Sequence, residues 1–260
     1  MSESKPKSDL APRAIVGVIL IAVAALALWS GGFLFWLLLV AVALLMLSEW
    51  SDLAKAQPRN KRVAQFALSV PLAIMCPLAS GASFFSLGLL GAAAFFTIII
   101  TYRPRLGAGT IYVGLPVLAL LAIRNQEGGL LLAFWAMALV WACDIGAYAA
   151  GRSLGGPKLA PAISPNKTWS GLIGGVVAAT AFAGLLTLWG LPVYLVAVTP
   201  LLAVAAQMGD LFESALKRRA GVKDSGNMLP GHGGFLDRLD GLVPVAPLAA
   251  LIILGHQALV

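Results

Sequence analysis

Long apolar runs alternate with short polar connections along the whole chain. Each run is long enough for a helix to cross a hydrocarbon core about 30 Å thick. The first run is followed at once by another, which favours a retained helix over a cleaved signal peptide. The pattern therefore predicts an all-α polytopic membrane protein with about nine transmembrane helices, near residues 14–29, 33–48, 64–79, 82–100, 107–123, 129–149, 170–189, 191–209 and 239–258.

The basic residues between these runs predict the orientation of the chain. If the N-terminus is cytoplasmic and the spans alternate, 17 of the 18 Lys and Arg residues lie on the cytoplasmic side, and only Arg124 lies outside. Such segregation follows the positive-inside rule. We therefore expect a cytoplasmic N-terminus and an external C-terminus.

The composition excludes an ordinary soluble domain. Charged residues make up 11% of the chain, against about 25% in typical globular proteins, and the mean hydropathy is +0.91. The net charge of +7 is explained by the positive-inside bias and by anionic headgroups. No aromatic stacking platform accompanies the basic residues, so nucleic acid is not an expected partner. Cys76 and Cys143 lie in apolar runs and are assigned no function.

The 11 carboxylates are unevenly placed. Five lie in predicted tails or loops and are given no special role: Glu3, Asp9, Glu49, Asp52 and Glu127. The other six lie at or between the cytoplasmic ends of the last spans: Asp144, Asp210, Glu213, Asp224, Asp237 and Asp240. This placement predicts that the C-terminal half carries the chemistry.

One group of polar residues shares a helix face at the end of the eighth run. In the stretch GDLFESALKRR, the spacing i, i+3, i+4 and i+7 puts four side chains on one face: Asp210, Glu213, Ser214 and Lys217. A solvated helix end with an ordinary Glu–Lys pair is the alternative. Acids at a membrane boundary usually face a polar cavity, which favours a functional face.

A second group lies at the start of the last run, in FLDRLDGL. Asp237 and Asp240 are three residues apart and share a face. With Asp210 they form a cluster of hard oxygen ligands, which suits Mg²⁺ bound together with substrate phosphates. The alternative is a surface Asp–Arg–Asp network through Arg238. Zinc is not indicated, since His256 is distant and no Cys is near.

The segment between these two groups has the residues that a polyphosphate needs. Its glycines permit close backbone approach, cations flank them, and His232 can donate or accept a proton. The glycines are Gly231, Gly233 and Gly234, and the cations are Lys217, Arg218, Lys223 and Arg238. Together with the carboxylates, this pattern predicts a site for a metal and a polyphosphate.

Two upstream features converge on the same side. Asp144 interrupts an apolar helix, and an intramembrane acid indicates a functional site, a hydrogen bond to Tyr148 or to a neighbouring helix being the alternative. In ISPNKTWSGLIGG, Ser164 before a proline suits a helix start, with Thr168 or Ser170 as alternative caps.

A helix start beside Lys167 would be a natural anion site, whereas a snorkelling lysine beside an interfacial Trp169 would have no ligand role. The stretch GRSLGGPK, residues 151–158, is not a phosphate-binding P-loop, because Pro157 stands where the lysine is required.

The stretch Ser214–Asp240 resembles the signature of the CdsA family, the phosphatidate cytidylyltransferases or CDP-diacylglycerol synthases. The signature elements are Ser-x-x-Lys-Arg, Lys-Asp at Lys223 and Asp224, Pro-x-His-Gly-Gly and Asp-Arg-x-Asp, all of which are present. The resemblance extends upstream through GDLFES, SPNKTW and DIGAYAAGR. Asn166 and Ser170 replace a Lys and a Glu that are common in the family, which puts in question a direct role for these two positions.

The resemblance implies a nucleotidyltransferase that converts CTP and phosphatidate to CDP-diacylglycerol and pyrophosphate in the plasma (inner) membrane. It also implies a homodimer, a site that faces the cytoplasm, and Mg²⁺ or Mn²⁺, with room for a monovalent cation such as K⁺. Asp210 and Asp237 would be metal ligands with Asp240 close by, and the cations with Lys167 would hold phosphates. His232 would orient groups in the site. Residues 1–105 would anchor the chain in the membrane, and residues 106–260 would be catalytic, with the signature at 214–240.

Two alternatives remain open from the residues. One is an enzyme of the same fold that acts on another lipid phosphate or on a polyprenol. The other is an ion transporter that uses Asp144 and the acidic cluster as a pathway, although no inverted repeat is evident.

Overall fold

A computed structural model of the protein describes residues 10–228 and 233–259. The long helices are α1 (Leu10–Ser30), α2 (Gly32–Leu53), α3 (Pro58–Ile74), α4 (Phe84–Thr101), α5 (Pro104–Arg124), α6 (Gly129–Leu154), α7 (Trp169–Leu186), α8 (Val193–Ala220) and α10 (Leu242–Leu259). The shorter elements are β1 (Lys158–Ala160), β2 (Ser164–Thr168), the 3₁₀ helix η1 (Thr187–Trp189) and α9 (Leu236–Leu239).

Each predicted apolar segment corresponds to one of these long helices. Seven helices of the described chain are long and apolar enough to cross a membrane: α2, α4, α5, α6, α7 (with η1), α8 and α10. The apolar part of α1 is the shorter stretch Val16–Ser30, and the first turns of α3 carry Arg59, Lys61 and Arg62. The described helices agree with an all-α polytopic membrane fold that has seven candidate spans, and the number of nine stays a prediction.

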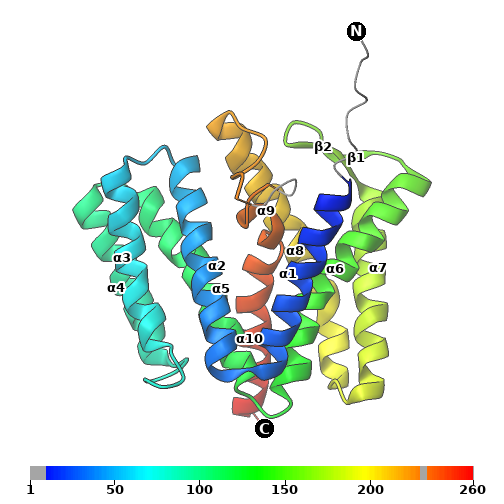
Figure 1. Ribbon diagram of the computed structural model, residues 1–260. Coiled ribbons are helices and arrows are strands. Elements are labelled where there is room, and N and C mark those ends of the chain that lie inside the picture. Colours follow the sequence, from blue (N-terminus) through cyan, green and yellow to red (C-terminus); the bar gives the residue numbers. More distant parts are fainter. Residues whose placement is uncertain (1–9, 229–232, 260) are drawn as a thin grey trace.

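Successive helices run in alternating directions (Figure 1). The α2–α3 connection, the β1–β2 hairpin and α9 lie at one end of the bundle, and the end of α10 lies at the other. At this second end, Arg124 donates from Nε to the carbonyl of Leu28 over 3.0 Å and from Nη2 to the carbonyl of Trp29 over 3.2 Å. Arg124 therefore binds free carbonyl groups at the end of α1.

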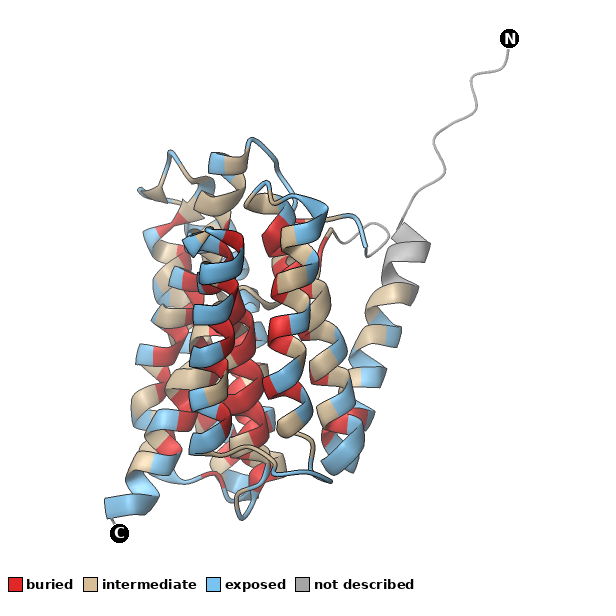
Figure 2. Ribbon diagram, turned by 90° about the vertical axis from the view of Figure 1, so that its left-hand side faces the viewer, coloured by how far each residue is buried: buried red, intermediate tan, exposed pale blue. Residues whose placement is uncertain are grey.

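Most buried side chains form one core along the bundle axis, a small second cluster consists of Cys143, Ala179 and Ala203, and the outer faces are largely exposed (Figure 2). Helix α5 is the most buried of the candidate spans. Many exposed outer residues are large and apolar, among them Phe95, Ile173 and Leu251. Such faces suit lipid chains as their solvent.

Helices α6 and α7 pack through small residues. A Cβ atom added to Gly174 would lie 2.2 Å from Cβ of Ala150, and one added to Gly146 would lie 2.3 Å from Cβ of Ala178. Close packing of small residues is a usual source of helix association in membranes. It fixes α6, which carries Asp144, against the start of α7.

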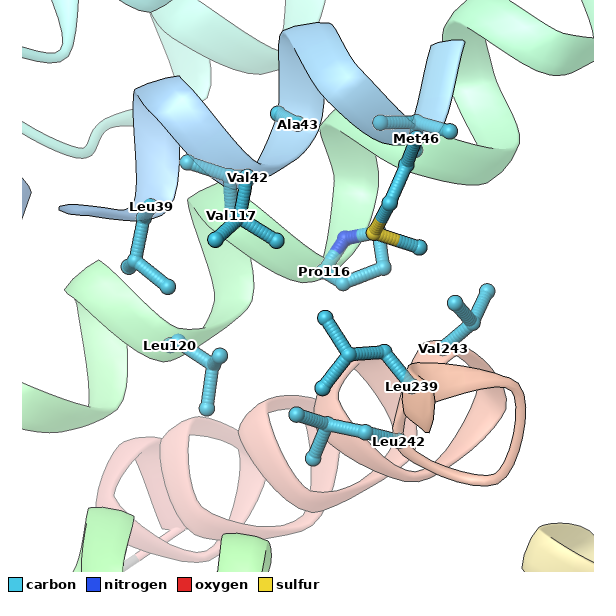
Figure 3. A pocket seen from close by; sticks show the side chains of 11 residues that line it. Leu39, Val42, Ala43, Met46, Pro116, Val117, Leu120, Leu239, Leu242 and Val243 are labelled. Carbon is cyan, nitrogen blue, oxygen red and sulfur yellow. The ribbon is translucent and has the colours of Figure 1, made fainter. Parts of the chain in front are cut away.

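A small apolar crevice lies between α2, α5 and the start of α10 (Figure 3). Its lining includes Met46, Pro116, Leu239 and Leu242, and its volume is about 40 Å³. A water molecule occupies about 30 Å³ of liquid, so the crevice is far too small for a lipid chain. It is a packing gap beneath α9.

The β1–β2 hairpin corrects one prediction. Ser164 does not cap a helix, because it begins β2 and pairs with Ala160 of the antiparallel partner strand. The cap of α7 is the alternative, Thr168, whose Oγ1 accepts from the N–H of Gly171 over 3.1 Å. The hairpin places Lys167 two residues before the start of α7, next to the cap Thr168.

We predict that Gly174→Ala destabilises the bundle, because the added methyl group collides with Ala150. Overpacking of this kind costs about 1–3 kcal/mol, which thermal unfolding in detergent would register as a lower melting temperature. Gly184→Ala on the same helix is the matched control, since its Cβ would have no atom within 4 Å. Equal melting temperatures for the two variants would contradict the packing argument.

Candidate functional site

A polar cavity of about 660 Å³ opens between α6, β2, the start of α7 and α8. Its lining contains acids, cations and amides: Asp144, Arg152, Asn166, Lys167, Gln207 and Asp210, with Tyr148 and Thr168 among the other contributors. The structure therefore brings together Asp144, Lys167 and Asp210, which lie far apart in the sequence. A cavity of this size with both signs of charge can hold a charged ligand.

Lys167 is the central cation of the cavity. Its Nζ lies 2.7 Å from Oδ2 of Asp210 and donates to Oε1 of Gln207 over 3.0 Å. The amide of Gln207 in turn donates from Nε2 to Oδ1 of Asp144 over 3.4 Å. Lys167 is thus held by α8 and does not snorkel freely, and one chain of hydrogen bonds links β2, α8 and α6.

Asp144 is hydrogen-bonded to a neighbouring helix, as one part of the alternative explanation predicted, and not to Tyr148. The partner of Asp144 is Gln207, whereas the Tyr148 hydroxyl accepts from Nη1 of Arg152 over 2.8 Å. Arg152 and Tyr148 are one helical turn apart on α6. They place a guanidinium group at the cavity wall beside the exposed outer face of the bundle.

The predicted polar face of α8 is present as one row. Ser214 donates from Oγ to Oδ1 of Asp210 over 3.3 Å, and Nζ of Lys217 lies 3.5 Å from Oε1 of Glu213. Glu213 is fully buried. The row connects the cavity, at Asp210, to the signature segment, which Lys217 contacts.

Asp237 is surrounded by donors. Its Oδ1 accepts from Nζ of Lys217 over 2.5 Å, and its Oδ2 accepts from the N–H of Gly234 (2.8 Å) and from the N–H and Oγ of Ser225 (both 2.9 Å). Burial acts to raise the pKa of Asp237, but these hydrogen bonds outweigh it and hold the pKa below its usual range. Asp237 is therefore a carboxylate at neutral pH.

Asp240 lies next to two other acids, Asp210 and Glu213. Burial raises the pKa of Asp240, and the charge of Asp210 adds to this rise. The fully buried side chain of Glu213 lies against Asp240, and its Oε1 is 3.5 Å from Nζ of Lys217. Three acids from α8 and the end of α9 therefore lie close together here.

This donor set fits a hard cation in its chemistry. Among residues 10–228 and 233–259, no three His, Cys, Asp or Glu side chains converge as a preformed metal site. Mg²⁺ usually takes only one or two carboxylates and completes its shell with water and phosphate oxygens. The assignment of Asp210, Asp237 and Asp240 as ligands stays a prediction.

The other predicted residues lie around these two groups. Lys223 and Asp224 are exposed in the connection after α8, and Arg238 is exposed on α9. Arg218 is exposed and donates to the carbonyl of Val222 over 3.4 Å. Ser164 is outside the lining of the cavity, and His232 lies outside the described residues.

The prediction that Glu49 lies in a loop without a role is wrong. Helix α2 continues to Leu53, and Glu49 is 1% exposed. Its Oε1 accepts from the N–H of Phe235 over 3.0 Å, and its Oε2 accepts from the N–H of Leu236 over 2.8 Å. The predicted span ended at residue 48 because Glu49 ends the apolar run, although the helix does not stop there.

Glu49 also changes the explanation of the signature glycines. A Cβ atom on Gly234 would lie 2.6 Å from Oε2 of Glu49, and one on Gly226 would lie 2.8 Å from Oε1. The N–H of Gly234 already binds Asp237. The need for a glycine at 226 and 234 is therefore explained by the carboxylate of Glu49, which occupies the space of a side chain.

Gln207 is a further residue of the site that no sequence motif singled out. Gln207 is a polar residue in an apolar run, which was the available signal. Ser170 donates from Oγ to the carbonyl of Gly155 and so ties the chain before β1 to the start of α7. Asn166 lines the cavity beside Lys167.

We predict that Lys217→Met strongly destabilises the protein, because it leaves Asp237 and Glu213 without their shared cation. Removing one partner of a buried ion pair costs about 3–5 kcal/mol, and the side chains of Lys217 and Asp237 are only 13% and 7% exposed. Thermal unfolding in detergent measures the loss. Arg219→Met, at an exposed position two residues on, is the control, and equal stability of the two variants would refute the expectation.

Comparison with known proteins agrees with this arrangement. Residues 11–255 match the sequence model of the cytidylyltransferase family. The phosphatidate cytidylyltransferase of Brucella suis is 41% identical over 257 residues, which cover 94% of this chain and 93% of the relative. That of Rickettsia bellii is 31% identical over 97% of this chain and 94% of the relative, and that of Bacillus subtilis is 49% identical over 53% of each. The chain therefore belongs to the cytidylyltransferase family.

Proposed function

We propose that this protein is a phosphatidate cytidylyltransferase. A phosphate oxygen of phosphatidate forms a bond to the α-phosphorus of CTP, and the bond between the α-phosphorus and the bridging oxygen breaks. CDP-diacylglycerol and pyrophosphate are the products. The lipid phosphate is already anionic at neutral pH, so the reaction requires charge neutralisation and in-line positioning rather than a strong base.

The cavity beside the α8 face is the observation that carries this proposal. Its wall contains cations and amides that suit phosphates, and the α8 row joins it to the signature segment. Ile145 and Tyr148, at the same level of α6, are 70% and 67% exposed on the outside of the bundle. A water-soluble nucleotide and a phosphate held in the bilayer could meet at such a place.

Each polar residue has a defined task on this proposal. Lys167 and Arg152, which both line the cavity, bind phosphate oxygens, and Gln207 holds Lys167 in position. Lys217 keeps Asp237 oriented through the ion pair. Lys223, Arg218 and Arg238 are exposed cations at the same end of the bundle and attract the triphosphate.

A divalent cation such as Mg²⁺ completes the site on this proposal. Asp210, Asp237 and Asp240 would hold it, and it would neutralise charge on the triphosphate and the departing pyrophosphate. The closeness of Asp240 to Asp210 and Glu213 supports this assignment. Mn²⁺ could replace Mg²⁺, and a monovalent cation such as K⁺ could accompany it.

The finer topology belongs to the same proposal. We place all nine long helices across the plasma (inner) membrane, with the N-terminus and the site on the cytoplasmic side, and we expect a homodimer. The support is the charge distribution and the alternation of the helices, which puts the basic connections at the end of the bundle that carries α9 (Figure 1). The C-terminal end of α10 then lies outside.

The decisive test of function is turnover by the purified protein in nanodiscs. With CTP, phosphatidate and Mg²⁺ we expect equal amounts of pyrophosphate and CDP-diacylglycerol, and no product in excess chelator. A panel of labelled lipid phosphates and polyprenols separates the same-fold alternative, in which another lipid would be the preferred acceptor. Ion flux in proteoliposomes without nucleotide turnover would instead establish a transporter.

Asp237→Asn should reduce turnover at least a hundredfold, because a neutral amide neither binds a cation well nor holds the ammonium group of Lys217. Initial rates at saturating CTP measure this change, and size-exclusion profiles in detergent show whether the variant is folded. Asp52→Asn, which removes an exposed carboxylate paired with Lys61, is the control. A folded Asp237→Asn variant with full activity would rule out the assigned role.

Site-directed labelling tests the orientation. Single cysteines, introduced in a cysteine-free background in whole cells, should react with a membrane-impermeant maleimide at Glu127, in the α5–α6 connection, and not at Arg219. We expect this contrast because the two positions lie at opposite ends of the bundle. Labelling of Arg219Cys but not Glu127Cys in intact cells would reverse the topology.

A further inference from the structure

The signature segment is anchored by hydrogen bonds to a residue of the N-terminal half. Glu49 lies on α2, and its three hydrogen-bonded partners, Ser225, Phe235 and Leu236, are about 180 residues further along the chain. Both carboxylate oxygens are used, one by Phe235 and the other by Leu236 and Ser225. No part of the proposed reaction requires a carboxylate at this buried position.

The position of Glu49 relative to Asp237 shows what it supports. Ser225 Oγ lies 2.9 Å from Oδ2 of Asp237 and 3.3 Å from Oε2 of Glu49. A hydroxyl group has one proton to donate, so the shorter contact takes it and Glu49 relies on the two backbone N–H groups. The two carboxylates therefore lie on either side of one serine and share the same short loop.

The backbone of the loop explains why a carboxylate is required. Phe235 and Leu236 begin α9, where the first N–H groups of a helix have no partner within the helix. The carboxylate of Glu49 accepts hydrogen bonds from both of these N–H groups in the protein interior, where Leu236 is fully buried. Fixing the start of α9 keeps the N–H of Gly234 within hydrogen-bond distance of the Asp237 carboxylate.

The end of α2 is itself fixed by the next residue. Trp50 donates from Nε1 to the carbonyl of Arg105 over 2.8 Å and stacks with Tyr112 and Phe212 at centroid distances of 4.8 and 6.4 Å. A Cβ atom on Gly109 would lie 2.3 Å from this indole. These contacts of Trp50 with α5 and α8 fix the position of Glu49, which precedes it on α2.

We infer that Glu49 is a positioning residue of the cytidylyltransferase site, which sets the place of Asp237 by anchoring the start of α9. This inference rests on the proposed function and deepens it. It assigns to the N-terminal half a contribution beyond membrane anchoring. Gly226 and Gly234 belong to the same device, since any side chain there would displace the carboxylate.

The test is Glu49→Gln in full-length protein in nanodiscs. The amide keeps the size of the side chain but turns one acceptor into a donor that faces a backbone N–H. We expect kcat to fall at least tenfold. We also expect CTP to bind with the stoichiometry of the wild type in calorimetry with Mg²⁺, since each molecule stays folded. Hydrogen exchange should become faster in peptides that cover 225–241 and stay unchanged in α3 and α4.

Asp52→Asn is the matched control, because it removes a carboxylate from the same helix at a position 57% exposed. It should match the wild type in every measurement. The inference is overturned if Glu49→Gln keeps wild-type kcat, or if exchange near α9 is unchanged. It is also overturned if CTP sites are lost in proportion to activity while exchange rises throughout the bundle, because Glu49 would then only stabilise the fold.

The experiment separates this inference from the proposed function. A wild-type protein that does not turn over CTP and phosphatidate would refute the function. The exchange measurement does not depend on turnover, so it would still show whether Glu49 holds the loop. Turnover by the wild type together with full activity of Glu49→Gln would leave the function standing and remove the positioning role.

Discussion

The ion pair between Lys217 and Asp237 is the contact on which the arrangement of the C-terminal helices depends. The two groups are 2.5 Å apart and largely buried. A buried charge pair is retained only where hydrogen bonds also satisfy its remaining atoms, and Ser225 and Gly234 do this for Asp237. Since Lys217 and Ser225 precede Gly234 on the chain by 17 and 9 residues, a single carboxylate gathers the end of α8, the connection and the start of α9 into one unit.

Sequence patterns predicted the features that depend on local geometry. The apolar runs gave the positions of the helices, because spanning length is a property of consecutive residues. The polar face of α8 was correctly predicted because i, i+3 and i+4 neighbours share a face in any α-helix. The predicted residues Asp144, Lys167 and Asp210 also meet in one cavity, although they lie far apart along the chain and no local pattern indicates the contacts that join them.

The features that were missed depend on contacts between distant segments. The β1–β2 hairpin has only short strands, and Ser164 before Pro165 suits a helix start as well as a strand. Glu49 ends an apolar run, so nothing local distinguishes it from a solvated helix end such as Asp52. Its burial results from packing against a loop nearly 190 residues away. Glycines near a proposed phosphate site can allow close approach of a ligand or close packing against a buried side chain. Only the tertiary structure shows that Gly226 and Gly234 leave room for Glu49.

Charge balance connects the structure to the proposed reaction. In the described part of the site, Lys167 and Lys217 contact three acids, Asp210, Glu213 and Asp237, while Asp240 lies beside two of these acids. Four acids are therefore gathered in the site before any ligand binds. A triphosphate would add several more negative charges in surroundings where repulsion is weakly screened. On this proposal a nucleotide enters together with cations, so the clustered acids make metal and nucleotide binding depend on each other.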